Sequence, residues 1–235
     1  MADADQKRTR ARELAAEFVA KGEPYRWFEI LYQEAERGES ILPWADRGPN
    51  GHMVAFWKAH SWGASGQRAL VVGCGLGDDA EQIAAWGFHT TAFDVSKTAI
   101  AMAKKRFPHS LVGYCIADLF SPPADFPGAF DFVFESNTVQ ALPENIREKA
   151  IEAIARFVKP GGRILVIARA RGEAEPAAQL PWPLTRNEIN GFVRAGLQEE
   201  SFEDLTDSEP PWTRRFRVLY RRPSQCNEIS RRWNI

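Results

Sequence analysis

The sequence predicts an α/β fold with a doubly wound, mostly parallel sheet and a helical N-terminal extension. From Arg68 onward, short apolar runs alternate with segments of helical periodicity. The first apolar run leads into the glycine turn Gly73–Gly77, which opens a helix. Asp94 and Asp118 end the next two apolar runs. Ligands of such sheets bind outside the carboxyl ends of the strands, so these residues predict a ligand site at that edge.

The first 62 residues have helical patterns and no strand pattern. Helices are expected at 3–21, 24–36 and 52–60, and a loop rich in proline and glycine separates the second from the third. We expect residues 1–62 to form a helical extension and lid over the ligand edge. Residues 63–235 are expected to form the ligand-binding domain, within one structural unit.

The remaining elements follow in alternation. Strands are expected at 68–72, 89–93, 111–116, 130–135 and 163–168, with a turn at 159–162. Helices are expected at 79–86, 97–106, 143–157 and 186–195. Segments 197–202 and 215–220 alternate like two closing antiparallel strands.

Composition excludes several classes of protein. Hydrophobic residues make up 44% of 235 residues and charged residues 26%, which is ordinary for a globular protein. A net charge of −1 gives no overall basic field for nucleic acid, and the arginines near the C-terminus are interpreted as a solvated face. No run reaches the length of a membrane span or a signal peptide. Three cysteines without paired or metal-binding spacing indicate a reduced, cytoplasmic protein without a metal site.

The glycine turn departs from the dinucleotide-binding pattern at its last position. That pattern has Gly or Ala where this chain has Asp78, and Asp79 follows. Pyrophosphate binds against the helix N-terminus in dinucleotide folds. Two carboxylates at this place disfavour phosphate and suit a ligand that carries positive charge.

Asp94 and Asp118 have candidate roles in binding a nucleoside. Asp94 lies 21 residues after Gly73, the usual spacing for a carboxylate that accepts hydrogen bonds from ribose hydroxyls. Its alternative role is to cap the helix from 97, for which Ser96 is equally suited. Asp118 is placed to accept a hydrogen bond from an adenine amino group, with Ala117 or Leu119 against the ring. Its alternative is a polar strand end.

Glu135 ends the fourth apolar run, again at the ligand edge. A partly buried carboxylate there either stabilises a cationic ligand, acts as a general base with a raised pKa, or accepts hydrogen bonds from the backbone of the next turn. The sequence favours none of these. Trp44 and Trp182 stand beside prolines in loops and are candidates for the pocket wall, where a cationic ligand would gain cation–π attraction.

Together these motifs resemble the class I methyltransferases that use S-adenosylmethionine (SAM), and most closely the branch of thiopurine, thiol and halide methyltransferases. The matching segments are 68–77, 87–100, 117–120, 130–134, 160–162 and 214–223, with the Pro-Trp loop at 43–48. The chain departs from the pattern at Val71, where many relatives have an acidic residue, at Ala45, which is inserted before Asp46, and at Glu135.

The resemblance implies a seven-stranded sheet in the order 3-2-1-4-5-7-6 with the last strand antiparallel. It also implies SAM as the cofactor. The cofactor contacts expected from the motifs are Trp44, Gly73, Cys74, Gly75, Gly77, Asp79, Asp94, Val95, Ala117, Asp118, Leu119 and Glu135.

The function expected from this resemblance is methyl transfer to a small molecule, with a thiol or halide ion as the first candidate acceptor. The alternative is an oxygen or nitrogen of a small aromatic or heterocyclic metabolite, for which Glu135 or His52 would act as base. Two further alternatives are an NAD-dependent oxidoreductase, against which Asp78 argues, and a SAM-binding protein without catalysis. Neither nucleic acid nor a membrane is an expected partner, and the oligomeric state is not indicated.

Overall fold

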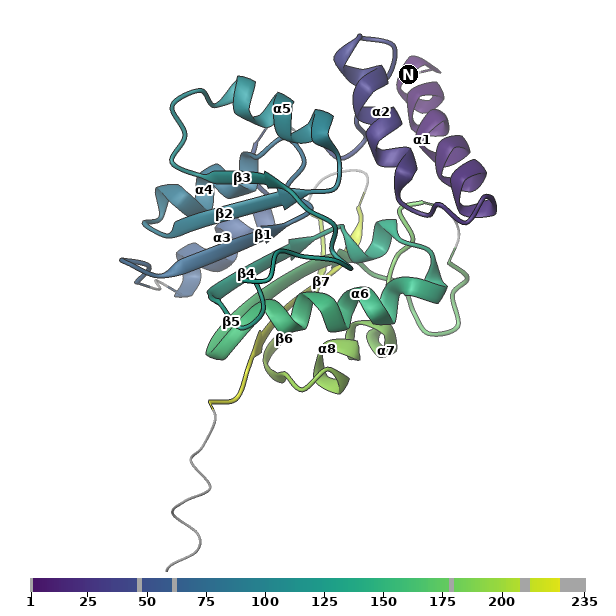
Figure 1. The fold of residues 1–235 in the computed structure, drawn as a ribbon. Coiled ribbons are helices and arrows are strands. Elements are labelled where there is room, and N and C mark those ends of the chain that lie inside the picture. The colour runs from purple at the N-terminus through teal and green to yellow at the C-terminus, as the bar shows by residue number, and fades with distance from the viewer. Residues whose placement is uncertain (1, 46–47, 61–62, 178–179, 208–211, 225–235) are drawn as a thin grey trace, which may run out of the picture.

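A seven-stranded sheet in the order β3-β2-β1-β4-β5-β7-β6 forms the centre of the computed structural model (Figure 1). The structure describes residues 2–45, 48–60, 63–177, 180–207 and 212–224, and side chains from residue 9 onward. The strands are β1 (Arg68–Val72), β2 (His89–Asp94), β3 (Gly113–Ile116), β4 (Phe130–Ser136), β5 (Val158–Arg169), β6 (Gln198–Thr206) and β7 (Arg214–Arg221).

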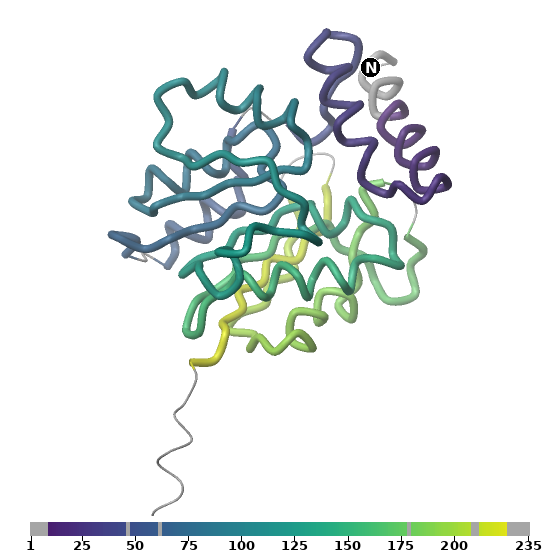
Figure 2. The backbone as a smooth tube through the Cα atoms, viewed as in Figure 1, coloured from purple at the N-terminus to yellow at the C-terminus, as the bar shows by residue number. Residues whose placement is uncertain are grey.

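The sheet is parallel except for its last strand in the sequence. β1 pairs in parallel with β2 and β4, whereas β7 runs antiparallel to both β5 and β6. In the tube view the C-terminal strand, in yellow, runs between the green strands β5 and β6 (Figure 2). The predicted fold class, strand order and antiparallel last strand are therefore confirmed.

Helices cover both faces of the sheet because the central strands are apolar on both sides. The helices are α1 (Ala2–Ala20), α2 (Arg26–Glu36), α3 (Gly51–His60), α4 (Asp78–Ala85), α5 (Lys97–Arg106), α6 (Glu144–Phe157), α7 (Arg186–Ile189) and α8 (Gly191–Arg194), with the 3₁₀ turn η1 (Val139–Ala141). In β1, Leu70 and Val72 face the core under α6 and α8, while Ala69 and Val71 face the core under α3, α4 and α5.

The N-terminal region divides between two cores. Residues of α1 and α2 form an apolar cluster of their own, to which Leu180, Trp44 and Ala141 contribute. By contrast, Met53 and Phe56 of α3 belong to the core of the sheet. Figure 1 accordingly shows α1 and α2 at one end of the molecule, beyond the edge of the strands. The expected boundary at residue 62 lies outside the described residues.

Three predicted boundaries were wrong for local reasons. The third strand begins at Gly113, not 111, because the Ser110 hydroxyl accepts the Val112 N–H and Leu111 stays 95% exposed. Segment 159–162 is not a separate turn but part of β5, with its Gly161 N–H bonded to the Arg222 carbonyl. β6 extends to Thr206, beyond the predicted 202, because it pairs with β7 along its length.

The helix predicted at 186–195 is two short helices. The Tyr220 hydroxyl donates a hydrogen bond of 2.9 Å to the Ile189 carbonyl, which turns that carbonyl away from a continuous helix. A capping box between Thr185 and Glu188 fixes the start of α7.

Arginines of β7 are paired with acidic residues in β6 and directly after it. Arg214 binds Asp204, Arg215 binds Asp207 and Arg217 binds Glu203, each at 2.6–2.9 Å. The basic strand seen in the sequence is thus neutralised by its neighbour. No helix within the described part of the chain has the length and apolar character needed to cross a membrane.

Candidate functional site

A cavity of about 1040 Å³ lies at the carboxyl edge of β1, β2, β3 and β4. This is at the upper end of the roughly 300–1,000 Å³ typical of small-molecule sites. Of the predicted site residues, those that line it are Trp44, His52, Gly73, Cys74, Gly75, Asp79, Asp94, Val95, Ala117, Asp118 and Leu119. Gly77, Glu135 and Trp182 are not in its wall.

The glycine turn brings backbone against the cavity. Gly73 and Gly75 have φ of 59° and 53°, a left-handed conformation that side chains disfavour. A Cβ on Gly73 would lie 2.5 Å from the Thr138 hydroxyl, and one on Gly75 would lie 2.9 Å from the Tyr32 hydroxyl. Gly77 has another purpose: it precedes α4, and a Cβ there would collide with the Tyr114 hydroxyl.

Asp94 joins the glycine turn to the end of β2. Its Oδ2 accepts the Gly75 N–H at 3.0 Å, and its Oδ1 accepts the Ser96 N–H at 2.9 Å. Ser96 caps α5, as its side chain accepts the Ala99 N–H. The capping role therefore belongs to Ser96, while Asp94 remains in the cavity wall. Burial raises the pKa of Asp94 to about 6, against the effect of these N–H donors.

The two carboxylates after the turn have different surroundings. Asp78 forms a two-pronged ion pair with Arg106 at 2.7 and 2.8 Å, so its charge is compensated. Asp79 is half-buried, accepts the Asn50 N–H at 2.6 Å and has its pKa raised by loss of contact with water to about 6. The expected repulsion of phosphate thus rests on Asp79 and not on both residues.

Asp118 lies at the opposite wall, after β3. Its Oδ1 accepts the Phe120 N–H at 2.8 Å, and the hydroxyl of Tyr25, which precedes α2, donates to its Oδ2 at 3.4 Å. Tyr25 also lies against Phe120, with 6.0 Å between ring centroids. Ala117 and Leu119 beside it are buried and line the cavity. An apolar stretch of wall with one carboxylate suits a heterocyclic base with an amino group.

Trp44 and Tyr32 cover the glycine turn from the N-terminal side. The Trp44 indole N–H donates to the Tyr32 hydroxyl at 3.1 Å, and their rings meet edge to face at 5.9 Å. Trp27 and Phe28 of α2 pack on Trp44 from its other side. Tyr32 was not predicted, because on a helix with apolar periodicity it is indistinguishable from a core residue. Trp182 instead packs under Arg147, 5.6 Å from its guanidinium.

Glu135 lies beneath the cavity wall. Its side chain has no exposed surface, and its Oε1 accepts the N–H groups of Thr138 and Val139 at 2.8 and 3.0 Å. Burial raises its pKa to about 7. These contacts favour the backbone-satisfying alternative: Glu135 holds the turn that leads into η1. Its predicted roles as base and as cofactor contact gain no geometric support.

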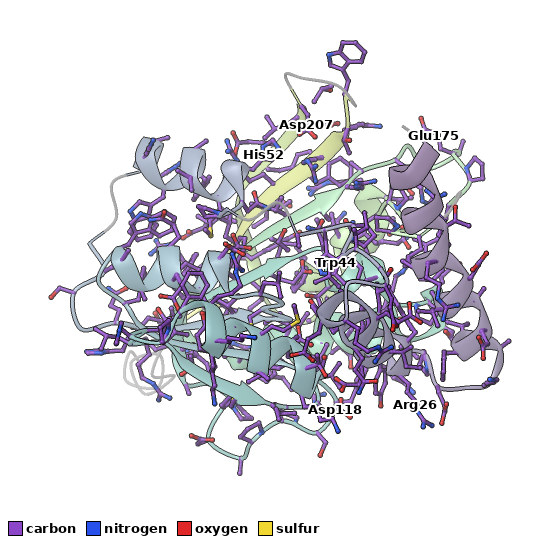
Figure 3. All side chains as sticks on the ribbon, turned by 90° about the horizontal axis from the view of Figure 1, so that it is seen from above. Arg26, Trp44, His52, Asp118, Glu175 and Asp207 are labelled. Carbon is purple, nitrogen blue, oxygen red and sulfur yellow. The ribbon has the colours of Figure 1, made fainter. Side chains whose placement is uncertain are left out.

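His52 lies in the wall near the β6–β7 hairpin. Its Nε2 is 2.7 Å from Asp207 Oδ1, and Arg215 holds the same carboxylate at 2.9 Å. Burial acts to raise the pKa of Asp207, but hydrogen bonds from Arg215 and His52 hold it below the usual range. Figure 3 shows His52 and Asp207 next to each other on one side of Trp44, and Asp118 on the other. Among the described residues, no three His, Cys, Asp or Glu side chains come together as metal ligands.

Comparison with known proteins shows similarity to methyltransferases. A family model described as a methyltransferase domain matches residues 69–162. Phosphoethanolamine N-methyltransferase 2 of Caenorhabditis elegans is 32% identical over 114 residues, which cover 47% of this chain and 25% of that protein. A ubiquinone biosynthesis O-methyltransferase of Aromatoleum aromaticum is 32% identical over 110 residues, 46% of each protein. A probable thiol methyltransferase 2 of Arabidopsis thaliana is 30% identical over 105 residues, 43% of this chain and 45% of that protein.

These matches span half or less of each relative's length. A solved structure gives wider coverage: N-methyltransferase NodS from Bradyrhizobium japonicum, in complex with S-adenosyl-L-homocysteine (SAH), has a TM-score of 0.65. That match covers 83% of this chain and 99% of NodS at 20% identity, which shows a common fold. The relatives' names span nitrogen, oxygen and thiol acceptors, so the matches leave the acceptor atom open.

Proposed function

We propose that this chain, whose residues 69–162 match the model of a methyltransferase domain and whose sheet has the order 3-2-1-4-5-7-6, transfers a methyl group from SAM to a small-molecule nucleophile. The observation that carries the proposal is the joint placement of Asp94 and Gly75 in the cavity wall. Each Asp94 oxygen has one lone pair occupied by a backbone N–H and keeps another for a ribose hydroxyl.

The other walls suit the remaining parts of SAM. Asp118, between Ala117 and Leu119, would accept a hydrogen bond from the adenine amino group. Asp79, whose carboxylate is anchored on the Asn50 N–H, favours a cationic ligand nearby. The cavity volume of about 1040 Å³ also leaves room for a small acceptor beside the cofactor.

The chemistry is an in-line displacement. A lone pair of the acceptor forms the bond to the methyl carbon, the carbon–sulfur bond breaks, and its electron pair stays on sulfur to give SAH. The protein contributes alignment, which is worth an effective molarity of roughly 10⁵ M or more when well oriented. A thiolate or halide needs no base at the transfer step, and these acceptors are the first candidates.

A screen of SAH formation tests the proposal. The purified protein is incubated with SAM and, separately, with iodide, small thiols, phenols and aromatic heterocycles. We expect SAH to form in the presence of at least one acceptor class. If SAM binds but no acceptor yields SAH, the protein is a SAM-binding protein without transferase activity.

The His52–Asp207 pair favours a second candidate, methyl transfer to an acceptor that must lose a proton. With Asp207 on Nε2, the other ring nitrogen of His52 is available to take the proton of an O–H or N–H acceptor.

Substitution of His52 tests this base role. His52→Gln is expected to lower kcat/KM by about 10²-fold or more on a phenol or heterocycle, because general-base catalysis has that magnitude. The same variant is expected to leave iodide methylation unchanged, because iodide has no proton to lose. Equal losses on both kinds of acceptor would contradict a base role and indicate a structural one.

A further inference from the structure

One corner of the cavity is not accounted for by the parts of SAM assigned above. It is formed by Arg12 of α1 and Gln140 of η1, and we name it the Arg12–Gln140 corner. The loop at 180–182 connects the two residues: Arg12 Nε donates to the Leu180 carbonyl at 3.4 Å, and the Trp182 N–H donates to the Gln140 carbonyl at 2.9 Å. Leu180 and Pro181 complete the wall between them.

Gln140 has a buried donor without a partner. Its side chain is 1% exposed, and its Oε1 accepts the Arg169 N–H at 2.6 Å. Because the oxygen is fixed by that N–H, the other amide atom must be the NH₂ group. Within the described residues this Nε2 has no hydrogen-bond acceptor. Unpartnered buried donors are uncommon in folded proteins, so a ligand atom is a natural partner for it.

Arg12 supplies positive charge at the same corner. It is half-buried, and no carboxylate in the described part of the chain lies within ion-pair distance of it. Two other charged residues of the cavity wall have an ion-pair partner: Arg215 pairs with Asp207, and Asp78 pairs with Arg106. A guanidinium and an amide NH₂ held by the two ends of this short loop are suited to an anion with two oxygens.

We propose that the methyl acceptor carries a carboxylate, which the Arg12 guanidinium and the Gln140 Nε2 bind at this corner. The inference rests on the proposed function and narrows its substrate class to organic acids, away from a bare halide ion. The methionine part of SAM also carries a carboxylate, so the test must separate the two sources of that group.

Matched acceptor pairs test the proposal. Mercaptoacetate is compared with 2-mercaptoethanol, and 4-hydroxybenzoate with phenol, by calorimetric binding to SAH-saturated protein and by SAH formation from SAM. The carboxylated member of each pair is expected to bind about tenfold or more tightly, since hydrogen bonds to charged groups have effects of that size. Equal or tighter binding of the neutral members would overturn the proposal.

Two variants assign the preference to the corner. Arg12→Gln is expected to reduce the preference for the carboxylated acceptor about tenfold or more. Gln140→Glu keeps the acceptor for the Arg169 N–H but replaces the donor by a negative charge, and should abolish this preference. Arg26→Gln is the matched control, because Arg26 is exposed, paired with Glu23 and outside the cavity wall. Melting temperatures establish that the variants are folded.

The affinity for SAM distinguishes the two carboxylates. The proposal requires that Arg12→Gln leave the Kd of SAM unchanged. A raised Kd with an unchanged acceptor preference would assign the corner to the methionine carboxylate and overturn the proposal. If no acceptor is methylated, Arg12-dependent binding of the carboxylated compounds still supports this site, and the proposed transferase activity alone fails.

Discussion

The function of a carboxylate at the edge of the cavity depends on its hydrogen bonds and on its exposure. Asp94 and Glu135 both end parallel strands and both accept two backbone N–H groups. They differ in exposure, since Asp94 lines the cavity and Glu135 has no exposed surface. Position at the ligand edge therefore does not assign a role. The direction of the side chain, which the sequence does not encode locally, decides between a ligand contact and a structural support.

Glu135→Gln tests the structural role of Glu135. Its pKa in the folded protein, about 7, lies above the usual value, so ionisation opposes folding. The contribution of Glu135 to the stability of the folded protein is therefore present at pH 4.5 and is lost as the pH rises through 7. The free energy of unfolding of the variant, relative to that of wild type, should therefore rise by up to about 3 kcal/mol between about pH 4.5 and about pH 8.

Urea unfolding at the two pH values measures this difference. SAM affinity and turnover are expected to stay near wild type, because Gln keeps an oxygen for the two N–H groups. If turnover instead drops by two orders of magnitude or more, roughly the contribution of a general base, while SAM affinity is unchanged, the role of general base is restored.

At the scale of elements, the turn between β1 and α4 is held by tertiary contacts as much as by its glycines. Gly75 is confined between the Asp94 carboxylate, which accepts its N–H, and the Tyr32 hydroxyl above it. Tyr32 is in turn fixed by Trp44. The N-terminal helices and the glycine turn therefore form one side of the site together.

Gly75→Ala tests this coupling, with Gly66→Ala as its control. Both glycines have positive φ, 53° and 76°, so both alanines carry a similar backbone strain of roughly 1–2 kcal/mol. The Cβ at 75 meets the Tyr32 hydroxyl, whereas at 66 no atom of the described residues lies within 4 Å. Calorimetric titration should show SAM affinity reduced about tenfold or more in Gly75→Ala and unchanged in Gly66→Ala. Equal affinities in the two variants would contradict the coupling.

At the scale of the whole molecule, the features that could be predicted from the sequence are the strands, the helices and the motifs at the strand ends. The placement of Gly73, Asp94 and Asp118 at one cavity follows from alternating strands and helices with motifs at the strand ends, whereas the strand order was implied by the resemblance to class I methyltransferases. The rest depends on contacts between distant segments. Arg12 meets the cavity through Leu180, 168 residues away, and His52 meets Asp207, 155 residues away. No local pattern marks either pair.

The side of the cavity that we propose for the acceptor consists largely of such long-range contacts. Arg12 comes from the extension, Gln140 from η1 and His52 from the start of α3, and the loop at 180–182 joins the first two. The architecture of the sheet thus positions the proposed cofactor residues, while the proposed acceptor residues are brought together by contacts between distant segments of this chain.

Calorimetric titration of the wild-type protein with SAM and with NADH tests the central claim most directly. We expect that SAM binds at one site per chain, that NADH does not compete, and that Asp94→Asn weakens SAM binding about tenfold or more through loss of the charged acceptor for ribose hydroxyls. Binding of NADH without SAM, or SAM binding that is indifferent to Asp94→Asn, would contradict the assignment of this cavity to SAM.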